Sequence, residues 1–536
     1  MFPVSWCRLA IVTFGLIGSM APTLGFSGSG RGDFHTVYHG QSVDDLVIQF
    51  MREHNIPGMS LAIVQAPYIT RVVGYGLADT QTKRLASTNT VFNIGQLTNA
   101  YTAVAIMQLK EDGKLQLDQG LGTYLTDDYI PKKWRTITIR DLLTHSSGLP
   151  DYTEASDFDF SKEYTPAQIS ALIKDKELSF TPGTQTFNSA TDFFLLGLII
   201  EKTSGMSYQD YVTKNQIERV GLHHTFFISN ISTVNNEVNN GTNPFKHSQF
   251  LNNPVMINPT EWASGYSDEN GTNVPAKPLS WTATFSNSGL IASAEDISIW
   301  DIALAGNILV KDPKDREFLY HPVTLKNGKV IPGNSGWFFP GHPGMMEIKG
   351  NVPGYSAFLS RFTAPTELVC VTLLANKGDI TDLDVLGRKV AGAFDTKLAA
   401  PIGASWSDTI QSPYSAQETL DRVEAIIKSQ GGTVFARIDH SGEAAKAGQK
   451  LQATQVLIIG NPAKGTSIME AKPAMALDLP LRIMATTDPD GQTWLSFTNP
   501  VVLANAYDLH DPRANVILKQ MEAALNKVCQ KAVSPY

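Results

Sequence analysis

Cysteine is scarce in this chain, with three residues among 536. Cys7 falls in an apolar stretch at the N-terminus, which leaves Cys370 and Cys529 for the remainder of the sequence. Two cysteines can form neither a disulfide framework nor a four-cysteine zinc site. We therefore expect two buried thiols.

An excess of positive charge is also missing. The 43 lysines and arginines are outnumbered by 51 aspartates and glutamates, and the formal net charge is −8. Proteins that bind nucleic acid present a basic surface, so the composition predicts no nucleic-acid partner. The hydrophobic fraction of 42% and the charged fraction of 18% exclude a largely disordered or coiled-coil protein.

Motifs for metals and cofactors are absent as well. No cluster of His, Asp and Glu has the spacing of metal ligands. The glycines of GNPAKGT at 460–466 do not have the spacing of a phosphate-binding loop. We predict neither a metal nor a cofactor.

Long apolar runs are absent beyond the N-terminus. Residues 9–18 (LAIVTFGLIG) form one run that follows a single charge, Arg8, and precedes small residues. This pattern is typical of a secretory signal, which we place at 1–25, and the run is too short to span a bilayer comfortably. An uncleaved membrane anchor is the alternative. The predicted location is periplasmic or secreted, with no stable membrane span after signal cleavage.

Most of the remaining chain, residues 35–400, has the pattern of one large α/β unit. Apolar periodicity and unbroken apolar runs predict helices at 43–54, 97–112, 139–143, 193–201 and 297–304. Strands are expected at 59–65, 70–75, 352–359 and 368–374. Because strands stand at both ends and helices between them, we expect an antiparallel sheet built from both ends of the unit.

Two stretches differ from this pattern. Residues 228–280 are rich in Asn, Pro, Ser and Gly, which predicts a long insertion or lid. Residues 401–414 (PIGASWSDTIQSPY) predict a linker. A second compact unit is expected at 415–536, with helices at both of its ends and four strands between them at 433–440, 455–460, 481–487 and 493–499.

Several runs of the first unit occur together and in a fixed order. They include VFNIGQLTNAYTAVAIMQLKEDGKLQLDQ at 91–119, ITIRDLLTHSSGLPDY at 137–152, FFLLGLIIEKTSGMSYQDYV at 193–212 and NVPGYSAFL at 351–359. The chain in this way resembles the serine β-lactamase and penicillin-binding protein superfamily, in its class C or esterase-like branch. The resemblance implies an α/β (α+β) sandwich, in which an antiparallel sheet is flanked by helices and a helical subdomain holds the middle third.

The resemblance also implies a site for acyl transfer. In the superfamily a serine opens a buried helix in an S-x-x-K motif, and the lysine assists its deprotonation. A Y-x-N motif moves the proton, and a K-T-G or H-x-G strand helps to form the oxyanion hole through its backbone.

The reactive side chains of these motifs are not present at the matching positions. The first motif falls on QLTN, where Gln96 replaces the serine and Asn99 replaces the lysine. In the second motif Asn188 replaces the tyrosine, and in the third Ile348 takes the basic or histidine position. A carboxamide is a poor nucleophile and has no proton to give up near neutral pH. Loss of such a nucleophile costs on the order of 10⁶ in rate, which favours a pseudoenzyme.

The cleft that holds the acyl-transfer site in the superfamily would then be neutral and lined by amides in this chain. Such groups both donate and accept hydrogen bonds, so they suit a polar small molecule, a peptide or a glycan. The residues expected to bind this ligand are Gln96, Asn99, Asn188, Gly350 and Asn351.

An active hydrolase or transferase with a non-standard nucleophile is the alternative. Its candidate residues are Ser189, Thr98 and Lys349. Thr98 should turn away from the cleft, because each helical residue rotates by about 100°. Lys349 should face away from Ile348 on a regular strand. His145 in THSSG is expected to be a structural turn residue, and Tyr101 a core residue.

Three runs of the second unit are TVFARIDHSGEAAKAG at 433–448, QVLIIGNPAKGTSIMEAKPAMALDLPLRIM at 455–484 and DGQTWLSFTNPVVLANAYDL at 490–509. They resemble the family called domain of unknown function 302. The resemblance implies a small α+β domain, commonly dimeric, and brings no established reaction. A homodimer through this domain is possible, and a structural dimerisation protein is a third functional alternative. Asp439 is expected to cap a strand end rather than to bind a metal.

Overall fold

A computed structural model describes most of the chain. The described residues are 29–32, 37–38, 40–66, 68–230, 261–328, 330–331, 333–339, 345–362, 369–380, 382–394, 398, 407–489, 491–507, 509 and 511–534. The predicted signal at 1–25 lies outside them, as does much of the expected insertion, at 231–260.

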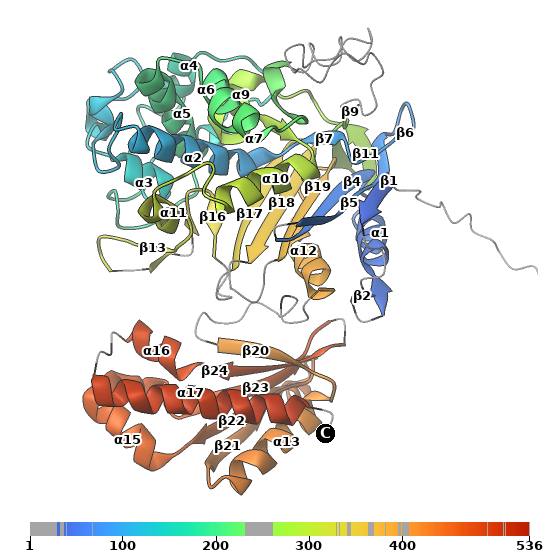
Figure 1. Cartoon of the computed structure of the whole chain (residues 1–536), viewed down its shortest axis with the longest axis vertical. Coiled ribbons are helices and arrows are strands. Elements are labelled where there is room, and N and C mark those ends of the chain that lie inside the picture. Colours follow the sequence, from blue (N-terminus) through green and yellow to red (C-terminus); the bar gives the residue numbers. More distant parts are fainter. Residues whose placement is uncertain are drawn as a thin grey trace, which may run out of the picture.

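The first unit is built on an antiparallel sheet of nine strands (Figure 1). Its order is β1 (Ser29–Gly32), β5 (Tyr68–Asp79), β4 (Gly58–Gln65), β19 (Val369–Ala375), β18 (Tyr355–Phe362), β17 (Met345–Val352), β16 (Trp337–Phe338) and β15 (Gly333–Asn334), with β6 (Arg84–Leu85) added to β5. Strands from the two ends of the unit meet where β4 pairs with β19. The predicted antiparallel sheet built from both ends is therefore confirmed.

Helices cover both faces of this sheet. Helices α1 (Val43–Glu53) and α12 (Leu383–Gly392) pack on one face, and α2 (Thr98–Glu111) and α10 (Ala294–Ala305) lie on the other (Figure 1). Side chains of a strand alternate between the two faces. In β4, for example, Leu61 and Ile63 join the core under α1 and α12, whereas Ala62 joins the larger core around α2.

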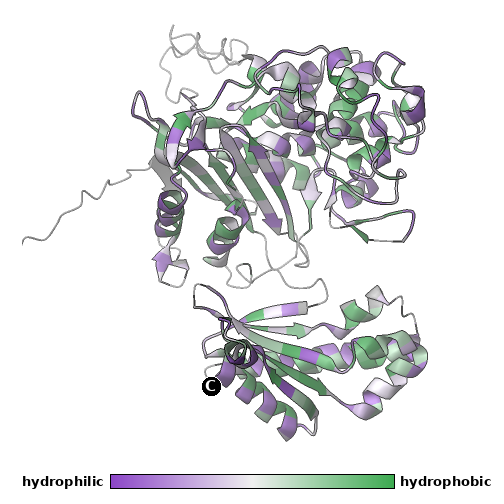
Figure 2. Cartoon of the chain, turned by 180° about the vertical axis from the view of Figure 1, so that it is seen from behind, coloured by the Kyte–Doolittle hydropathy of each residue, from purple (hydrophilic) through white to green (hydrophobic). Residues whose placement is uncertain are grey.

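The sequence patterns of α1 and α2 explain their different positions. Ser42 and Asp45 form a reciprocal capping box that starts α1, and its apolar residues lie on one face. Figure 2 shows hydrophilic and hydrophobic residues alternating along this helix. By contrast, every residue of α2 from Thr98 to Leu109 is buried. A helix without a polar face belongs in the interior of a domain.

A helical region stands beside the sheet and contributes to the larger core. Its helices are α3 (Ile139–Leu143), α4 (Pro166–Ala171), α5 (Ala190–Ser204), α6 (Tyr208–Val212), α7 (Glu218–Val220), α9 (Trp281–Ser288) and α11 (Pro313–Leu319). A smaller sheet joins β8 (Thr225–Phe227), β12 (Leu290–Ala292), β7 (Thr90–Asn93) and β9 (Glu261–Trp262). The described end of the expected insertion also forms a hairpin, β10 (Tyr266–Glu269) with β11 (Thr272–Pro275).

One strand predicted in the first unit, at 352–359, is confirmed over 355–359 by β18 but starts too early. The expected strand at 352–359 spans a hairpin turn, because β17 ends at Val352 and β18 begins at Tyr355. Between them stand Pro353 and Gly354, and Gly354 has a φ of 90°, which favours glycine. Pro353 and Gly354 are a typical turn pair, so the predicted strand should have started after them, as β18 does.

The second unit is an α+β domain with a five-stranded antiparallel sheet (Figure 1). The strand order is β20 (Ser407–Ser412), β24 (Thr493–Thr498), β23 (Leu481–Thr487), β22 (Thr454–Gly460) and β21 (Thr433–Asp439). The predicted linker at 401–414 therefore contains an edge strand, β20. The helices are α13 (Ala416–Ser429), α14 (His440–Lys446), α15 (Pro462–Ala471), α16 (Pro500–Ala506) and α17 (Pro512–Val533).

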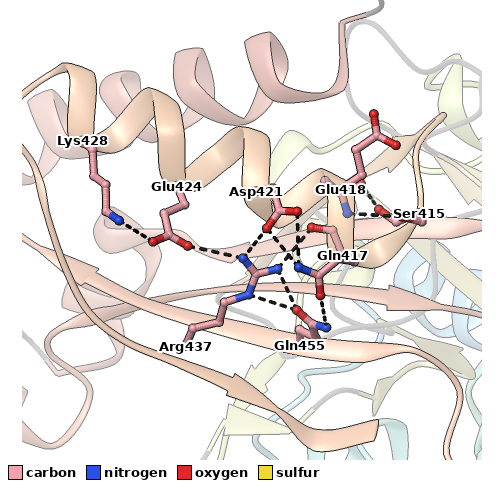
Figure 3. A network of polar contacts seen from close by, with 9 residues as sticks. Ser415, Gln417, Glu418, Asp421, Glu424, Lys428, Arg437 and Gln455 are labelled. Atoms are coloured by element: carbon pink, nitrogen blue, oxygen red, sulfur yellow. Dashed lines mark hydrogen bonds and ion pairs between the residues drawn. The ribbon is translucent and has the colours of Figure 1, made fainter. Parts of the chain in front are cut away.

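A polar network ties α13 to β21 and β22 (Figure 3). The Arg437 guanidinium donates to Glu424 Oε2 at 3.3 Å and to Gln455 Oε1 at 3.0 Å, and it also pairs with Asp421. Several charge-assisted bonds from one planar group fix the orientation of a helix over a sheet. Cys370 and Cys529 are both buried thiols outside any disulfide, as predicted.

Candidate active site

A cavity of about 270 Å³ lies at the start of α2. Its walls come from six separate parts of the sequence: the entry to α2, the turn after α3, the segment before α5, β14 (Val330–Ile331), the β15–β16 hairpin and β17. The lining residues are Gln96, Asn99, Thr144, His145, Thr186, Asn188, Ile331, Gly333, Asn334, Gly336, Trp337, Phe338 and Lys349. Three predicted ligand-binding residues, Gln96, Asn99 and Asn188, therefore share one cavity wall.

Gln96 stands on a short 3₁₀ turn, η1 (Gly95–Leu97), that leads into α2. The Asn93 side chain accepts a hydrogen bond from the Gly95 N–H at 2.8 Å and so holds this turn. The backbone N–H of Asn351 on β17 donates to Gln96 Oε1 at 2.7 Å. The carboxamide oxygen at the expected nucleophile position is therefore already bound by a backbone donor of the third-motif strand.

Glycine allows η1 and β17 to approach this closely. A Cβ atom on Gly350 would lie 2.2 Å from the carbonyl oxygen of Ile94. One on Gly95 would lie 2.8 Å from the backbone nitrogen of Asn351. No larger side chain fits at Gly350 without separating the two segments. Gly350 and Asn351 thus position Gln96 but are not among the residues that line the cavity.

Asn99, in the lysine position, is buried with 2% of its surface exposed. Its Oδ1 has no hydrogen-bond partner among the described residues. Asn188, in the tyrosine position, is exposed at the cavity wall. A buried amide oxygen without a partner is costly, so the Asn99 side chain is an unusual feature at the start of α2.

The third motif divides between the two faces of the sheet. Ile348 is buried in the larger core and does not line the cavity. Lys349 touches the cavity, but its Nζ pairs with Asp384 of α12 at 2.9 Å. The strand is regular here, and the prediction that Lys349 faces away from Ile348 agrees with its contact to α12.

The two hydroxyl candidates lie outside the cavity wall. Thr98 is buried, and its Oγ1 accepts from the backbone N–H of Leu290 at 3.3 Å, so it packs α2 against β12. Ser189 is the N-cap residue of α5 and is fully buried, with no partner for its hydroxyl in the described part of the chain. Tyr101 stacks on Trp300 with ring centroids 4.1 Å apart, as expected for a core residue.

His145 was expected to be a structural turn residue, but it also lines the cavity. It adopts a φ of 52°, which is uncommon for a residue other than glycine. His145 Nδ1 lies 2.8 Å from Asp192 Oδ2 on α5, and the hydroxyl of Ser147 donates to Asp192 Oδ1 at 2.5 Å. Burial raises the pKa of Asp192 to about 6, although the hydrogen bonds from His145 and Ser147 oppose the rise. This pair was missed because its members stand 47 residues apart.

The β15–β16 hairpin is the second part of the wall that the sequence did not reveal. Gly336 at its tip has a φ of 85°, and a Cβ there would lie 2.9 Å from Asn99 Cβ. Trp337 is buried beside it, whereas Phe338 leaves 44% of its surface exposed. The hairpin therefore closes the cavity over Asn99 and adds an exposed aromatic ring to it.

Two further predictions concern metals and the second unit. The described residues hold no group of three or more His, Cys, Asp or Glu side chains that could bind a metal ion. Asp439 is the N-cap of α14 and accepts from the Gly442 N–H at 2.9 Å, so it is a helix cap. GNPAKGT begins helix α15, with Asn461 as its N-cap.

Two family models match the chain. The Beta-lactamase model matches residues 43–392, and the model named "Domain of unknown function DUF302" matches residues 408–529. Protein flp of Staphylococcus aureus (strain MW2) is 25% identical over 339 residues, which are 63% of this chain and 63% of that protein. The match thus spans less than two thirds of that relative's length.

Solved structures have the same fold. The octameric penicillin-binding protein homologue from Pyrococcus abyssi aligns with a TM-score of 0.53 at 19% identity, over 85% of this chain and 89% of that one. A class C beta-lactamase aligns with a TM-score of 0.50 at 21% identity, over 66% of this chain and 95% of that one. Within the described residues, no helix is both long and apolar enough to cross a membrane. The first family model covers more than half of the sequence, and the chain therefore belongs to the Beta-lactamase family and carries a DUF302 domain after it.

Proposed function

We propose that this chain is an exported pseudoenzyme of the Beta-lactamase family that binds a polar ligand in the cavity at the start of α2. The export signal at 1–25 and the periplasmic or secreted location are part of the proposal and rest on the sequence pattern. The observation that carries the proposal is the hydrogen bond from the Asn351 N–H to Gln96 Oε1.

This hydrogen bond has a direct chemical meaning. In an acyl-transfer site, a backbone N–H of the third-motif strand stabilises the oxygen of the substrate carbonyl as negative charge develops on it. Here the carboxamide of Gln96 supplies a carbonyl oxygen of its own to such a donor. Gln96 therefore supplies no nucleophile, and its oxygen also takes up the Asn351 N–H, the donor that would otherwise polarise a substrate carbonyl.

The remaining wall supports binding in place of catalysis. Asn99 cannot take a proton from a nucleophile, and neither can Asn188. The candidate hydroxyls Thr98 and Ser189 are buried outside the lining, which disfavours a hydrolase or transferase that uses either of them. Amides, hydroxyls and aromatic rings around a cavity of about 270 Å³ suit a small polar ligand or one residue of a peptide or glycan.

Stepwise restoration of the motifs tests this proposal. The full-length wild type and its variants are incubated with a fluorescent penicillin, and the adducts are measured by intact mass. Gln96→Ser alone should be barely labelled, because Asn99 cannot assist its deprotonation. Adding Asn99→Lys should permit slow acylation, and adding Asn188→Tyr should raise the rate by about 10²–10⁴-fold, as proton transfer typically does. The matched control is Gln96→Ala with Asn99→Lys, which has the new charge but no nucleophile.

The wild type gives the decisive comparison in this series. We expect no adduct, and any turnover measured for the wild type should survive Gln96→Ala unchanged. Labelling of the wild type at one site would overturn the proposal and support the active-hydrolase alternative.

Homodimerisation through the second unit is a second candidate role. Its edge strand β21 exposes two large apolar side chains, Phe435 at 51% and Ile438 at 37%. An unpaired apolar edge strand is a surface for association with another chain. Light scattering of the full-length protein tests this role, with Phe435→Glu as the variant that should dissociate a dimer.

A further inference from the structure

His145 is the polar group of the cavity with the most unusual setting. Its Nδ1 contacts the buried Asp192 carboxylate at 2.8 Å, and its side chain is 16% exposed. Its other ring nitrogen, Nε2, makes no hydrogen bond to any described residue. It is also not one of the fully buried polar atoms without a partner, so part of its surface is exposed. That nitrogen therefore remains accessible from the cavity.

Asp192 determines which nitrogen of His145 carries the proton. An ionised carboxylate only accepts hydrogen bonds, so Nδ1–H must be the donor, which leaves Nε2 with a free lone pair. Ser147 holds the other carboxylate oxygen at 2.5 Å, so Asp192 cannot rotate away without losing that bond. The backbone of His145 also adopts a positive φ of 52°, which has a conformational cost for a residue other than glycine.

We propose that His145 Nε2 is a hydrogen-bond acceptor for the ligand, and that the cavity takes an uncharged, N-acylated sugar. This inference rests on ligand binding in the cavity, as proposed above. Asp192 and Ser147 act through His145 and are positioning residues.

The charges around the cavity favour an uncharged ligand. The Lys349 ammonium, which could attract an anion, is paired with Asp384 on the other face of the sheet. Asp192 faces the His145 ring, and Asp151 lies near enough to Asp192 to contribute to its raised pKa. No charged group in the described lining is thus left to neutralise a carboxylate or an ammonium group.

The acceptors and rings match a sugar. Sugar hydroxyls and N-acyl N–H groups donate hydrogen bonds, and His145 Nε2 is an acceptor for them. Phe338 lies at the cavity with 44% of its surface exposed and can cover the apolar face of a pyranose ring. Gln96 Oε1 is occupied by Asn351 N–H, which leaves the Gln96 amide to donate to an acyl oxygen.

The full-length protein should be titrated with N,N′-diacetylchitobiose as the neutral probe and with digalacturonate as the anionic one. At pH 7.5 we expect binding of the first and none of the second. His145→Phe should weaken binding about tenfold, and Asp192→Asn several-fold, whereas His440→Phe, at an exposed histidine of the second unit, should leave it unchanged.

The histidine ring gives a readout that does not depend on the ligand. Spectra of ¹⁵N-histidine-labelled protein should show His145 as the Nδ1–H tautomer, and Asp192→Asn should abolish this preference. An Nε2–H tautomer, unchanged affinity in His145→Phe, equal binding of digalacturonate, or no binding of the neutral probe would each overturn the inference. These outcomes are distinct from failure of the proposed function, which would appear as a covalent adduct of the wild type.

Discussion

Gly350→Ala tests the contact between η1 and β17 on which the site depends. The new Cβ would stand 2.2 Å from the Ile94 carbonyl oxygen, and real Cβ atoms essentially never come closer than 3.0 Å to another heavy atom. The Ile94 oxygen is a backbone atom, and the new Cβ would be bonded to the backbone of β17. No flexible side chain can therefore move to relieve the contact. The strand and the 3₁₀ turn must therefore move apart by about 1 Å.

The expected cost follows from two effects. Overpacking of this kind costs about 1–3 kcal/mol. The separation also stretches the 2.7 Å hydrogen bond from Asn351 N–H to Gln96 Oε1, and loss of a typical hydrogen bond costs about 1 kcal/mol. The free energy of unfolding of the first unit should fall by about 2–4 kcal/mol.

Urea titration of the full-length protein measures this loss, and hydrogen exchange reports on the Asn351 amide. The matched control is Gly333→Ala, where the nearest atom, Trp337 O, lies at an ordinary 3.7 Å. The control should change stability by less than about 1 kcal/mol. A Gly350→Ala protein with unchanged stability and unchanged exchange at Asn351 would refute the close contact and the position assigned to Gln96.

Three further substitutions have expected outcomes. Burial lowers the pKa of His224 to about 4. Between about pH 4 and pH 6.5, this histidine is therefore protonated in the unfolded chain but neutral in the folded protein. The free energy of unfolding should therefore be highest above pH 6.5 and fall by about 2–3 kcal/mol as the pH drops toward 4. His224→Gln should flatten that part of the plot of urea midpoint against pH. Arg437→Met should lower the stability of the second unit by about 1 kcal/mol, with a smaller loss at high salt. Phe435→Glu should convert a dimer seen by light scattering into monomers without changing the calorimetric transition.

Local patterns in the sequence predicted many elements correctly. The five residues of α3 (Ile139–Leu143) match the expected helix because a capping box at Thr138 and Asp141 marks its start. The buried helix α2 was found because it lacks a polar face. β20, the edge strand at 407–412, was missed because its alternation is weak and prolines flank the region. The turn at Pro353 and Gly354 was missed although this pair is typical of turns.

The site was predictable only in part. Gln96, Asn99 and Asn188 were placed together through the motif positions of the superfamily, and all three line the same cavity. The pairing of His145 with Asp192 depends on how α3 and α5 pack, and no short sequence pattern encodes it. The β15–β16 hairpin reaches Asn99 through a glycine, Gly336, that resembles any other turn glycine in the sequence. Long-range contacts of this kind follow from tertiary packing.

The most direct test of the central claim is the intact mass of the unmodified full-length protein after exposure to a fluorescent penicillin and, separately, to a fluorophosphonate. Gln96 offers no nucleophile, and its oxygen already takes the Asn351 N–H. We therefore expect an unchanged mass with both reagents under conditions that label the Gln96→Ser, Asn99→Lys variant with penicillin. Stoichiometric modification of the wild type at a single residue would contradict it.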